Sequence, residues 1–147
     1  MTNHERYMNI AVAEAHKGLK EGDPPIGACL VKDGKILGRG HNRRVSEGSQ
    51  ILHGEMDAFR NAGRGNYNGA VLYTTHYCCR MCMATASLFG VKTVIIGEAK
   101  TFYDDVSAVI AEMSGIEIVI LDLDEPRILL RGFIKRHEEI WNEDIGR

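Results

Sequence analysis

Apolar runs and helix-like segments alternate along the second half of the chain, and this alternation limits the possible folds more than any other feature. The runs AVLYTT, KTVIIGE and EIVIL, at residues 70–75, 92–98 and 117–121, have the length and composition of buried strands. Segments with helical character separate them, at residues 78–90 and 104–113. Strands that are joined through helices usually lie parallel in one sheet. This half therefore predicts parallel crossovers.

The first half predicts a helix followed by an antiparallel hairpin. Between residues 4 and 20, apolar residues recur at helical spacing: Tyr7, Met8, Ala11, Val12, Ala15 and Leu19. Gly22 and Pro24–Pro25 end this helix. The stretch 26–42 is typical of two strands around Asp33-Gly34, a dipeptide favoured in tight turns. Further helices are predicted within 51–63 and over most of 125–141.

Together these elements predict a single α/β domain that spans residues 1–147. The expected architecture is a three-layer α/β/α sandwich with a five-stranded mixed sheet in the middle. A chain of 147 residues can bury a proper core. Its 44% hydrophobic and 26% charged residues are ordinary for a globular protein and argue against disorder.

Composition also indicates the cellular compartment of the protein and the classes of partner that it does not bind. No apolar run approaches the roughly 20 residues of a bilayer span, and the beginning MTNHERYMNI lacks the layout of a signal peptide. We therefore expect a cytoplasmic protein with reduced thiols and no membrane partner. The net charge is −2 and the basic residues are dispersed, with Arg43-Arg44 the densest basic spot in the first half. This argues against a large nucleic-acid surface but leaves a local basic groove open.

Three of the four cysteines stand within five residues, in the stretch TTHYCCRMCMATA (74–86). Upstream, HGE places a histidine at the start of a predicted helix. His53, Cys79 and Cys82 make three zinc ligands and leave a tetrahedral ion one open position for water. Since a structural site would normally use a fourth protein ligand, this set predicts a catalytic zinc ion, one per chain.

Glu55 is the predicted catalytic base. Two thiolates already neutralise a zinc ion, so a nearby carboxylate would help to take the proton from the bound water and deliver it to a substrate. The alternative is a non-catalytic, zinc-stabilised binding module. In that case Glu55 is only a first-turn carboxylate that stabilises the start of its helix.

The order H-x-E followed by C-x-x-C is similar to the signature of zinc-dependent nucleobase deaminases. The segments PPIGACLV, LGRGHN, LHGE, LYTT and WNEDIGR extend the resemblance, which is closest to fungal-type cytosine deaminases and covers most of the chain. The resemblance implies hydrolytic deamination of a free pyrimidine base by zinc-activated water, with release of ammonia. It also implies the deaminase sandwich fold, a small-molecule substrate and a homodimer.

The resemblance also implies a set of substrate-binding residues. Asn42 and Asp144 would hold the ring edge, and the backbone of Gly54 would contact the ring carbonyl. Three apolar residues would form the walls of a flat pocket: Ile26, Phe102 and Trp141. Without the resemblance, Asn42 would be interpreted as a strand-end loop residue, the aromatics as core, and Asp144 as a solvated charge.

Some positions depart from the family pattern. Cys78 replaces the proline of the signature and so is not a ligand by analogy, while Cys29 is expected to be a buried small residue. Tyr77 replaces a small serine, and Asn142 replaces a second aromatic residue. Both are expected near the substrate, and His76 stands beside Tyr77. These changes favour a pocket retuned from cytosine to isocytosine, which carries an N–H beside the reactive carbon.

Two other deaminase activities remain open. A tRNA adenosine deaminase would act on a flipped base in RNA and should carry a basic surface. The net negative charge and the WNEDIG ending argue against it. A deaminase for guanine or another free purine is the second alternative, and pocket size would distinguish it.

Overall fold

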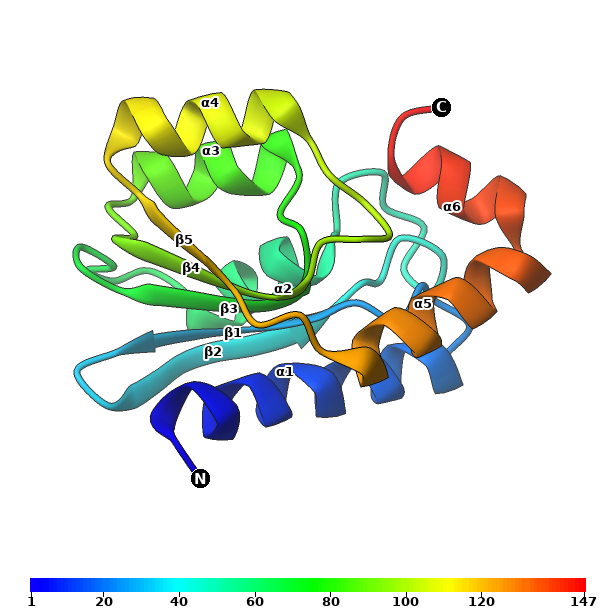
Figure 1. Ribbon diagram of the computed structural model, residues 1–147, viewed down its shortest axis with the longest axis horizontal. Helices are drawn as coiled ribbons and strands as arrows, with labels where there is room; N and C mark the ends of the chain where they lie inside the picture. The colour runs from blue at the N-terminus through cyan, green and yellow to red at the C-terminus, as the bar shows by residue number, and fades with distance from the viewer.

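The computed structural model describes residues 1–147, and five strands form its central sheet (Figure 1). In chain order these are β1 (Gly27–Lys32), β2 (Lys35–His41), β3 (Val71–His76), β4 (Thr93–Glu98) and β5 (Glu117–Ile120). Their order in the sheet is β2-β1-β3-β4-β5. β1 pairs antiparallel with β2 and β3, whereas β3, β4 and β5 are parallel. The predicted mixed five-stranded sheet is confirmed.

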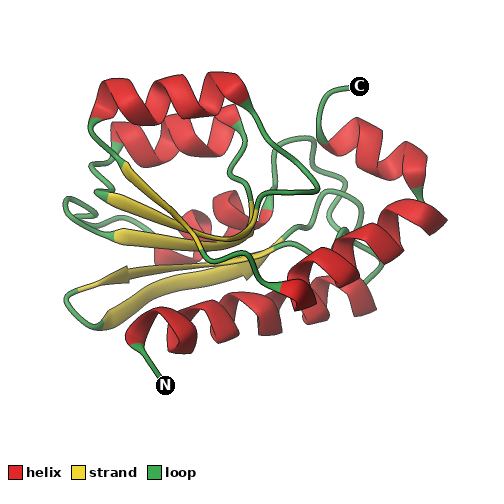
Figure 2. Ribbon diagram, viewed as in Figure 1, coloured by secondary structure: helices red, strands yellow, loops and turns green.

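Six helices surround the sheet (Figure 2). They are α1 (Asn3–Lys20), α2 (Gly54–Ala62), α3 (Arg80–Leu88), α4 (Asp105–Ser114), α5 (Asp124–Arg136) and α6 (Glu138–Asp144). Helices α2, α3 and α4 cover one face, and α1 and α5 cover the other (Figure 1). The three-layer α/β/α sandwich is therefore confirmed. No helix combines the length and the apolar character that crossing a bilayer requires.

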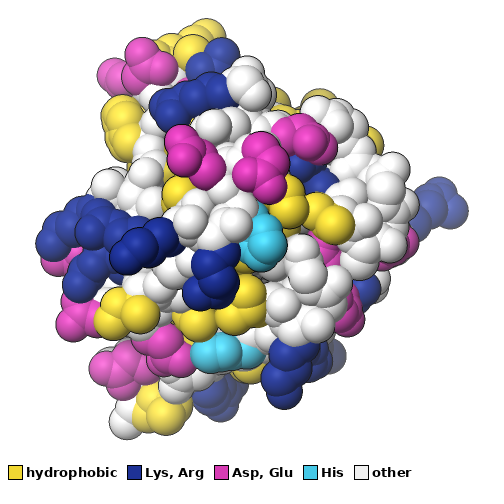
Figure 3. All heavy atoms as spheres, turned by 90° about the vertical axis from the view of Figure 1, so that its right-hand side faces the viewer, with side chains coloured by type: hydrophobic (Ala, Val, Ile, Leu, Met, Phe, Trp, Pro, Cys, Tyr) yellow, Lys and Arg dark blue, Asp and Glu magenta, His cyan; other side chains and the backbone are white.

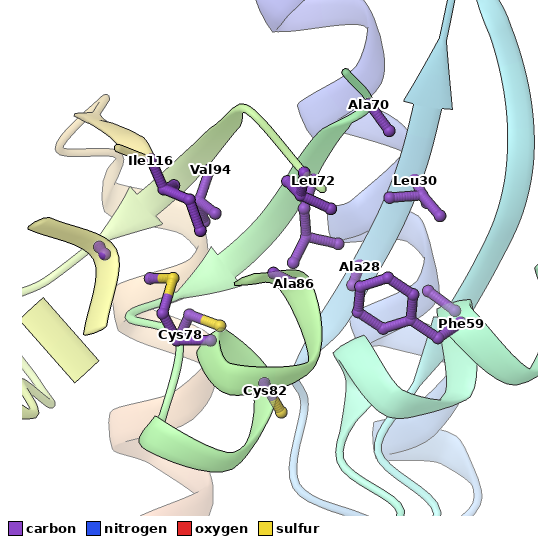
Figure 4. Packing of buried hydrophobic residues seen from close by; sticks show 14 of the residues in the cluster. Ala28, Leu30, Phe59, Ala70, Leu72, Cys78, Cys82, Ala86, Val94 and Ile116 are labelled. Carbon is purple, nitrogen blue, oxygen red and sulfur yellow. The ribbon is translucent and has the colours of Figure 1, made fainter. Parts of the chain in front are cut away.

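The two faces of the sheet carry separate cores because strand side chains alternate between faces. Leu30, Leu72 and Val94 pack under α2 and α3, in the larger cluster that Figure 4 shows with Phe59 and Cys82. The neighbouring strand residues point to α1 instead: Cys29, Val31, Tyr73 and Ile95. Cys29 is fully buried there, as expected of a small apolar residue.

Glycines let α1 and α2 approach the hairpin closely. A Cβ atom on Gly27 would lie 2.0 Å from the carbonyl oxygen of Ala11 in α1. A Cβ atom on Gly40 would lie 2.6 Å from the backbone nitrogen of Ala58 in α2. The glycines of the GAC and GRGHN segments therefore set the spacing between helices and sheet on both faces.

The C-terminal helical region differs from the prediction. One mostly helical segment was expected over 125–141, but the chain breaks at His137, whose backbone has φ −141° and ψ 55°. Helix α6 continues beyond the predicted end, to Asp144. The break turns α6 away from α5 and places it over one end of the sheet (Figure 1).

A buried charge cluster joins α1 to the end of β2. Its centre is His41, whose side chain is 2% exposed. The Nδ1 atom of His41 lies 3.0 Å from Oε1 of Glu14, and its Nε2 atom lies 2.9 Å from Oε2 of Glu21. The hydrogen bond to Glu14 raises the pKa of His41 above its usual value. Burial opposes this shift, and the hydrogen bond to Glu21 adds to it. Burial opposes ionisation of Glu14. The hydrogen bonds of the Glu14 carboxylate outweigh this effect and lower its pKa to about 2, and the bond to His41 contributes most.

This cluster predicts a stability that decreases in mildly alkaline solution. The folded pKa of His41 lies above its unfolded value of about 6.5, so the stabilisation is complete below pH 6.5 and is lost as the pH rises through the folded pKa. We expect His41→Asn to lower the free energy of unfolding by about 2 kcal/mol at pH 6 and by less at pH 9. Urea unfolding of both proteins across this range measures the difference. A difference that stays constant with pH would contradict a charged His41.

Candidate metal centre and active site

Three ligand atoms meet where α2 and α3 begin. His53 and Cys79 are the N-cap residues of these helices, and Cys82 lies in the first turn of α3. Nδ1 of His53 lies 3.4 Å from Sγ of Cys79 and 3.8 Å from Sγ of Cys82, and the two sulfurs are 3.6 Å apart. A tetrahedral zinc ion with ordinary bond lengths would have ligand atoms roughly 3.5–3.8 Å apart. The donor set therefore fits zinc.

Protons and a metal ion compete for the same ligand atoms at this site. Burial opposes protonation of His53, but the Cys79 sulfur and the Asp144 carboxylate raise its pKa to about 9. Contact with Cys82 and burial raise the pKa of the Cys79 thiol far above its usual range. Buried thiols of this kind keep their protons unless a positive charge replaces them, and a divalent metal ion supplies that charge.

Glu55 follows the histidine by two residues and is 3% exposed. Burial raises the pKa of its carboxyl group above the usual value. Glu55 is not part of the ligand cluster, which contains His53, Cys79 and Cys82. The ligand cluster therefore has three protein donors, and a carboxyl group lies near them, since Glu55, His53 and Cys79 line one cavity.

This cavity is small and largely enclosed, with a volume of about 20 Å³. Its lining comprises Ile26, His53, Glu55, His76, Tyr77, Cys79, Phe102, Trp141, Asp144 and Ile145. All three predicted apolar walls are among them, and the rings of Phe102 and Trp141 meet edge to face with their centroids 5.9 Å apart. A larger cavity of about 590 Å³ lies next to it, and five residues line both: His53, Cys79, Phe102, Asp144 and Ile145.

Asn42 lies behind Asp144 and does not line the cavity. Nδ2 of Asn42 donates a hydrogen bond to Oδ1 of Asp144 at 2.7 Å, and Oδ1 of Asn42 accepts one from the backbone N–H of Arg44. Oδ2 of Asp144 faces Nε2 of His53 at 3.8 Å. Gly54 also lies outside the cavity lining, with its Cα close to Ile26 and Asn42. A direct substrate contact by Asn42 or Gly54 stays a prediction.

Asn142 also lies outside the cavity lining, so a substrate contact by Asn142 stays a prediction. It was expected beside the substrate, but it is half-buried outside the cavity, and its carbonyl oxygen accepts a hydrogen bond from the N–H of Arg147. The reason is helical geometry. Trp141, Asp144 and Ile145 share one face of the C-terminal turns, whereas Asn142 lies about 100° around the helix.

Tyr77 does lie in the cavity wall and is 5% exposed. Its ring packs against that of Tyr103, with centroids 4.7 Å apart, and burial raises the pKa of Tyr77 to about 12. Cys78 is fully buried under the sheet-facing side of α3, and its carbonyl oxygen accepts a hydrogen bond from Ser107. It does not belong to the ligand cluster.

Sequence reasoning assigned no role to two residues of the cavity, His76 and Ile145. The ring of His76 lies between Oγ1 of Thr75 and the carbonyl oxygen of Pro126, at 2.8 Å from each. Burial lowers the pKa of His76 to about 4, so the ring is neutral. The position of His76 at the end of β3, three residues before Cys79, was the available signal.

The fold and site define a class of protein: an α/β/α sandwich in which a histidine and two cysteines at helix starts form a candidate zinc site. The comparisons make the assignment specific. Residues 1–98 match the model of the cytidine and deoxycytidylate deaminase zinc-binding region. The chain belongs to this deaminase family.

Relatives within the family act on different substrates. The chain is 41% identical to the cytosine deaminase of Candida albicans over 146 residues, which cover 97% of this chain and 96% of that protein. It is also 41% identical to the tRNA-specific adenosine deaminase of Bacillus subtilis, but over 101 residues, 66% of this chain and 63% of that protein.

Solved structures have the same fold. A tRNA:A34 deaminase superimposes with a TM-score of 0.70 and 25% identity, covering 81% of this chain and 99% of that one. RibD of Acinetobacter baumannii superimposes with a TM-score of 0.73 and 24% identity, over 97% of this chain and 40% of that one. The second likeness concerns the fold alone.

Proposed function

We propose that this deaminase converts a free pyrimidine base, cytosine or its isomer isocytosine, to uracil and ammonia. The observation that carries the proposal is the enclosure of the metal centre by α6, which contributes Trp141 and Asp144 to the cavity wall. An enclosed cavity suits a small free base better than a base that remains attached to RNA. The similarity to the Candida cytosine deaminase, which extends over nearly the whole of both chains, supports the same substrate class.

In this reaction a C–O bond forms at the ring carbon that carries the amino group, and the C–N bond breaks. Zinc held by His53, Cys79 and Cys82 would acidify a water molecule and so supply the nucleophile. Glu55 takes a proton from that water and delivers protons to the adjacent ring nitrogen and then to the departing amine. Its burial beside the ligands suits a group that must both accept and donate protons.

The remaining groups hold the ring. Oδ2 of Asp144 is the carboxylate oxygen that Asn42 leaves free, and it is available to accept a hydrogen bond from a ring N–H. Phe102 and Trp141 form apolar walls for a flat ring. A volume of about 20 Å³ holds only about one water molecule. Binding of a base therefore requires the cavity to widen, and the residues shared with the larger cavity mark the side on which it opens.

The charges around the larger cavity also favour an uncharged substrate. Four acidic residues line it, Asp104, Asp105, Glu143 and Asp144, against two arginines, Arg80 and Arg147. Arg80 is neutralised by Asp104 at 2.9 Å. On this side of the molecule, acidic side chains interrupt the basic ones (Figure 3). Because phosphate groups require an excess of positive charge, this surface is a poor match for RNA.

A second candidate is tRNA adenosine deamination, which the match to the Bacillus subtilis enzyme favours. A substrate panel separates the two. We expect the zinc-loaded protein to release ammonia from cytosine or isocytosine and not from guanine, adenine or a tRNA anticodon stem–loop. Turnover of the stem–loop without turnover of any free base would reverse the ranking.

The panel also tests whether the pocket is retuned. Tyr77 is the residue to vary first, because it lines the cavity and Asn142 does not. If Tyr77 selects isocytosine, Tyr77→Ser should shift the ratio of kcat/KM values toward cytosine by about tenfold or more. A strong preference of the unaltered protein for cytosine would end the retuning hypothesis.

We also propose a cytoplasmic homodimer. Large apolar side chains are exposed on α3, α4 and the turn after α3: Leu88, Phe89, Val109 and Met113. Such a surface suits contact with a second copy. Sedimentation analysis of the zinc-loaded protein would determine the mass in solution, and a monomer at micromolar concentration would count against the dimer.

A further inference from the structure

The pair Arg43-Arg44 is the densest basic spot in the first half of the chain, and its side chains do not form a basic surface. Arg43 binds Oδ2 of Asp57 through Nε at 2.9 Å, and its Nη1 lies 3.6 Å from Glu21. The side chain of Arg44 is only 2% exposed and turns the other way, toward α6. The two neighbouring cations therefore serve different parts of the molecule.

Arg44 joins the loop after β2 to the C-terminal helix, which lies beside it (Figure 1). Its Nε donates a hydrogen bond to the carbonyl oxygen of Gln50 at 2.9 Å, which fixes the plane of the guanidinium group. Its Nη2 donates to Oε1 of Glu143 at 3.1 Å. Its Nη1 lies 3.5 Å from Oδ1 of Asp144. One buried cation thus contacts two successive acidic residues of α6.

The Nη1 atom has no hydrogen-bond partner although it is buried. An unpaired buried N–H group is costly, so its position needs a reason. The nearest acceptor is the carboxylate of Asp144, whose side chain is 3% exposed and lies in the cavity wall. Asp144 is in turn a buried anion, and such a charge is tolerated only with a partner of opposite sign.

We propose that Arg44 is a positioning residue that holds the side chain of Asp144 in place for binding the substrate ring. This rests on the proposed function, in which Oδ2 of Asp144 accepts a ring N–H. Asn42 donates to Oδ1 of Asp144 and Arg44 lies beside the same oxygen, whereas Oδ2 faces His53, which lines the cavity with Asp144. Arg44 is not a catalytic residue, because it does not line the cavity.

The test replaces Arg44 by glutamine, which keeps the length of the side chain but removes the charge. We expect KM for the preferred base to rise about tenfold or more, with kcat within about threefold, because ring binding weakens while Glu55 and the metal ligands are untouched. Hydrogen exchange of the α6 amides should become faster while exchange in α4 stays the same.

The neighbouring arginine provides a matched control. Arg43→Gln removes a charge from the same loop and breaks the ion pair with Asp57, but Arg43 makes no contact with α6. We expect this variant to lower the melting temperature and to leave KM and α6 exchange unchanged. Equal changes of KM in the two variants would assign Arg44 a merely structural role and overturn the proposal.

A double-mutant cycle with Asp144→Asn tests whether Arg44 acts through Asp144. If it does, Arg44→Gln should change KM by less than twofold once Asp144 is already neutral. Additive effects on KM would overturn the proposal. If Arg44→Gln does not fold, Arg44→Lys takes its place in the KM measurement. A lysine keeps the charge but does not reach all three partners. An unchanged KM in that variant would reject the proposal.

The exchange measurement separates this inference from the proposed function. If no base in the panel is deaminated, the proposed function fails. Faster hydrogen exchange of α6 in Arg44→Gln would still show that Arg44 holds α6 in place. Unchanged α6 exchange in that variant overturns the positioning role whatever the activity shows.

Discussion

Replacing Glu55 by glutamine is expected to lower kcat by a factor of about 10³ while leaving the fold and zinc content unchanged. Glutamine keeps the shape of the side chain but cannot accept a proton from water or deliver one to a ring nitrogen. The site tolerates the neutral amide, because Glu55 is fully enclosed and its burial already disfavours the charged carboxylate. The measurements are steady-state ammonia release, bound zinc per chain and the melting temperature.

This substitution also decides between the enzyme and a zinc-stabilised binding module. If Glu55 only stabilised the start of α2, Glu55→Gln would lower the stability slightly and leave any turnover intact. Glu125→Gln is the matched control, because Glu125 is a first-turn acid of α5 with an exposed side chain. We expect it to leave kcat unchanged. Full activity in Glu55→Gln would remove the proton-transfer role.

Replacing Cys82 by alanine is expected to weaken zinc binding more than about 100-fold and to abolish turnover with it. The substitution leaves two protein ligands, and the loss of a ligand should exceed the 10- to 100-fold effects that are typical of residues supporting a ligand. Competition with a chromophoric chelator measures the affinity without relying on activity. The buried position of Cys82 in the first turn of α3 makes a loss of stability a further expected result.

The third thiol of the cluster provides the control. Cys78→Ala removes an equally buried thiol from the adjoining position, outside the ligand cluster. We expect this variant to bind one zinc ion per chain with an affinity within about tenfold of the unaltered protein. Retention of zinc by Cys82→Ala together with its loss from Cys78→Ala would make Cys78 the ligand and refute the assignment.

Much of the fold was predictable because its determinants are local. The turn at Asp33-Gly34 requires positive φ at both residues, and the structure has 49° and 75° there. The alternation of apolar runs with helices predicted the parallel half of the sheet. The break at His137 was missed, since neither a proline nor a glycine marks it and the residues on both sides continue to favour helix.

The metal site was predictable for a related reason. Cys79 and Cys82 are three residues apart at a helix start, so their meeting depends on one helical turn. His53 required one long-range contact, between the first turns of α2 and α3. The pocket walls came from family resemblance. Asn142 lies outside the cavity lining, and sequence proximity to Trp141 does not reveal which residues share a face of a short terminal helix.

The sheet, the three-layer arrangement and the zinc-ligand set could be predicted from the chain alone, because they depend on periodicity, turn residues and short spacings. The directions in which the charged side chains face depend on the complete fold. Arg43 and Arg44 are adjacent in the chain, yet one binds Asp57 and the other lies beside Asp144, a hundred residues away. Burial of ions depends on partners brought together by the whole fold, and local patterns carry no information about those partners.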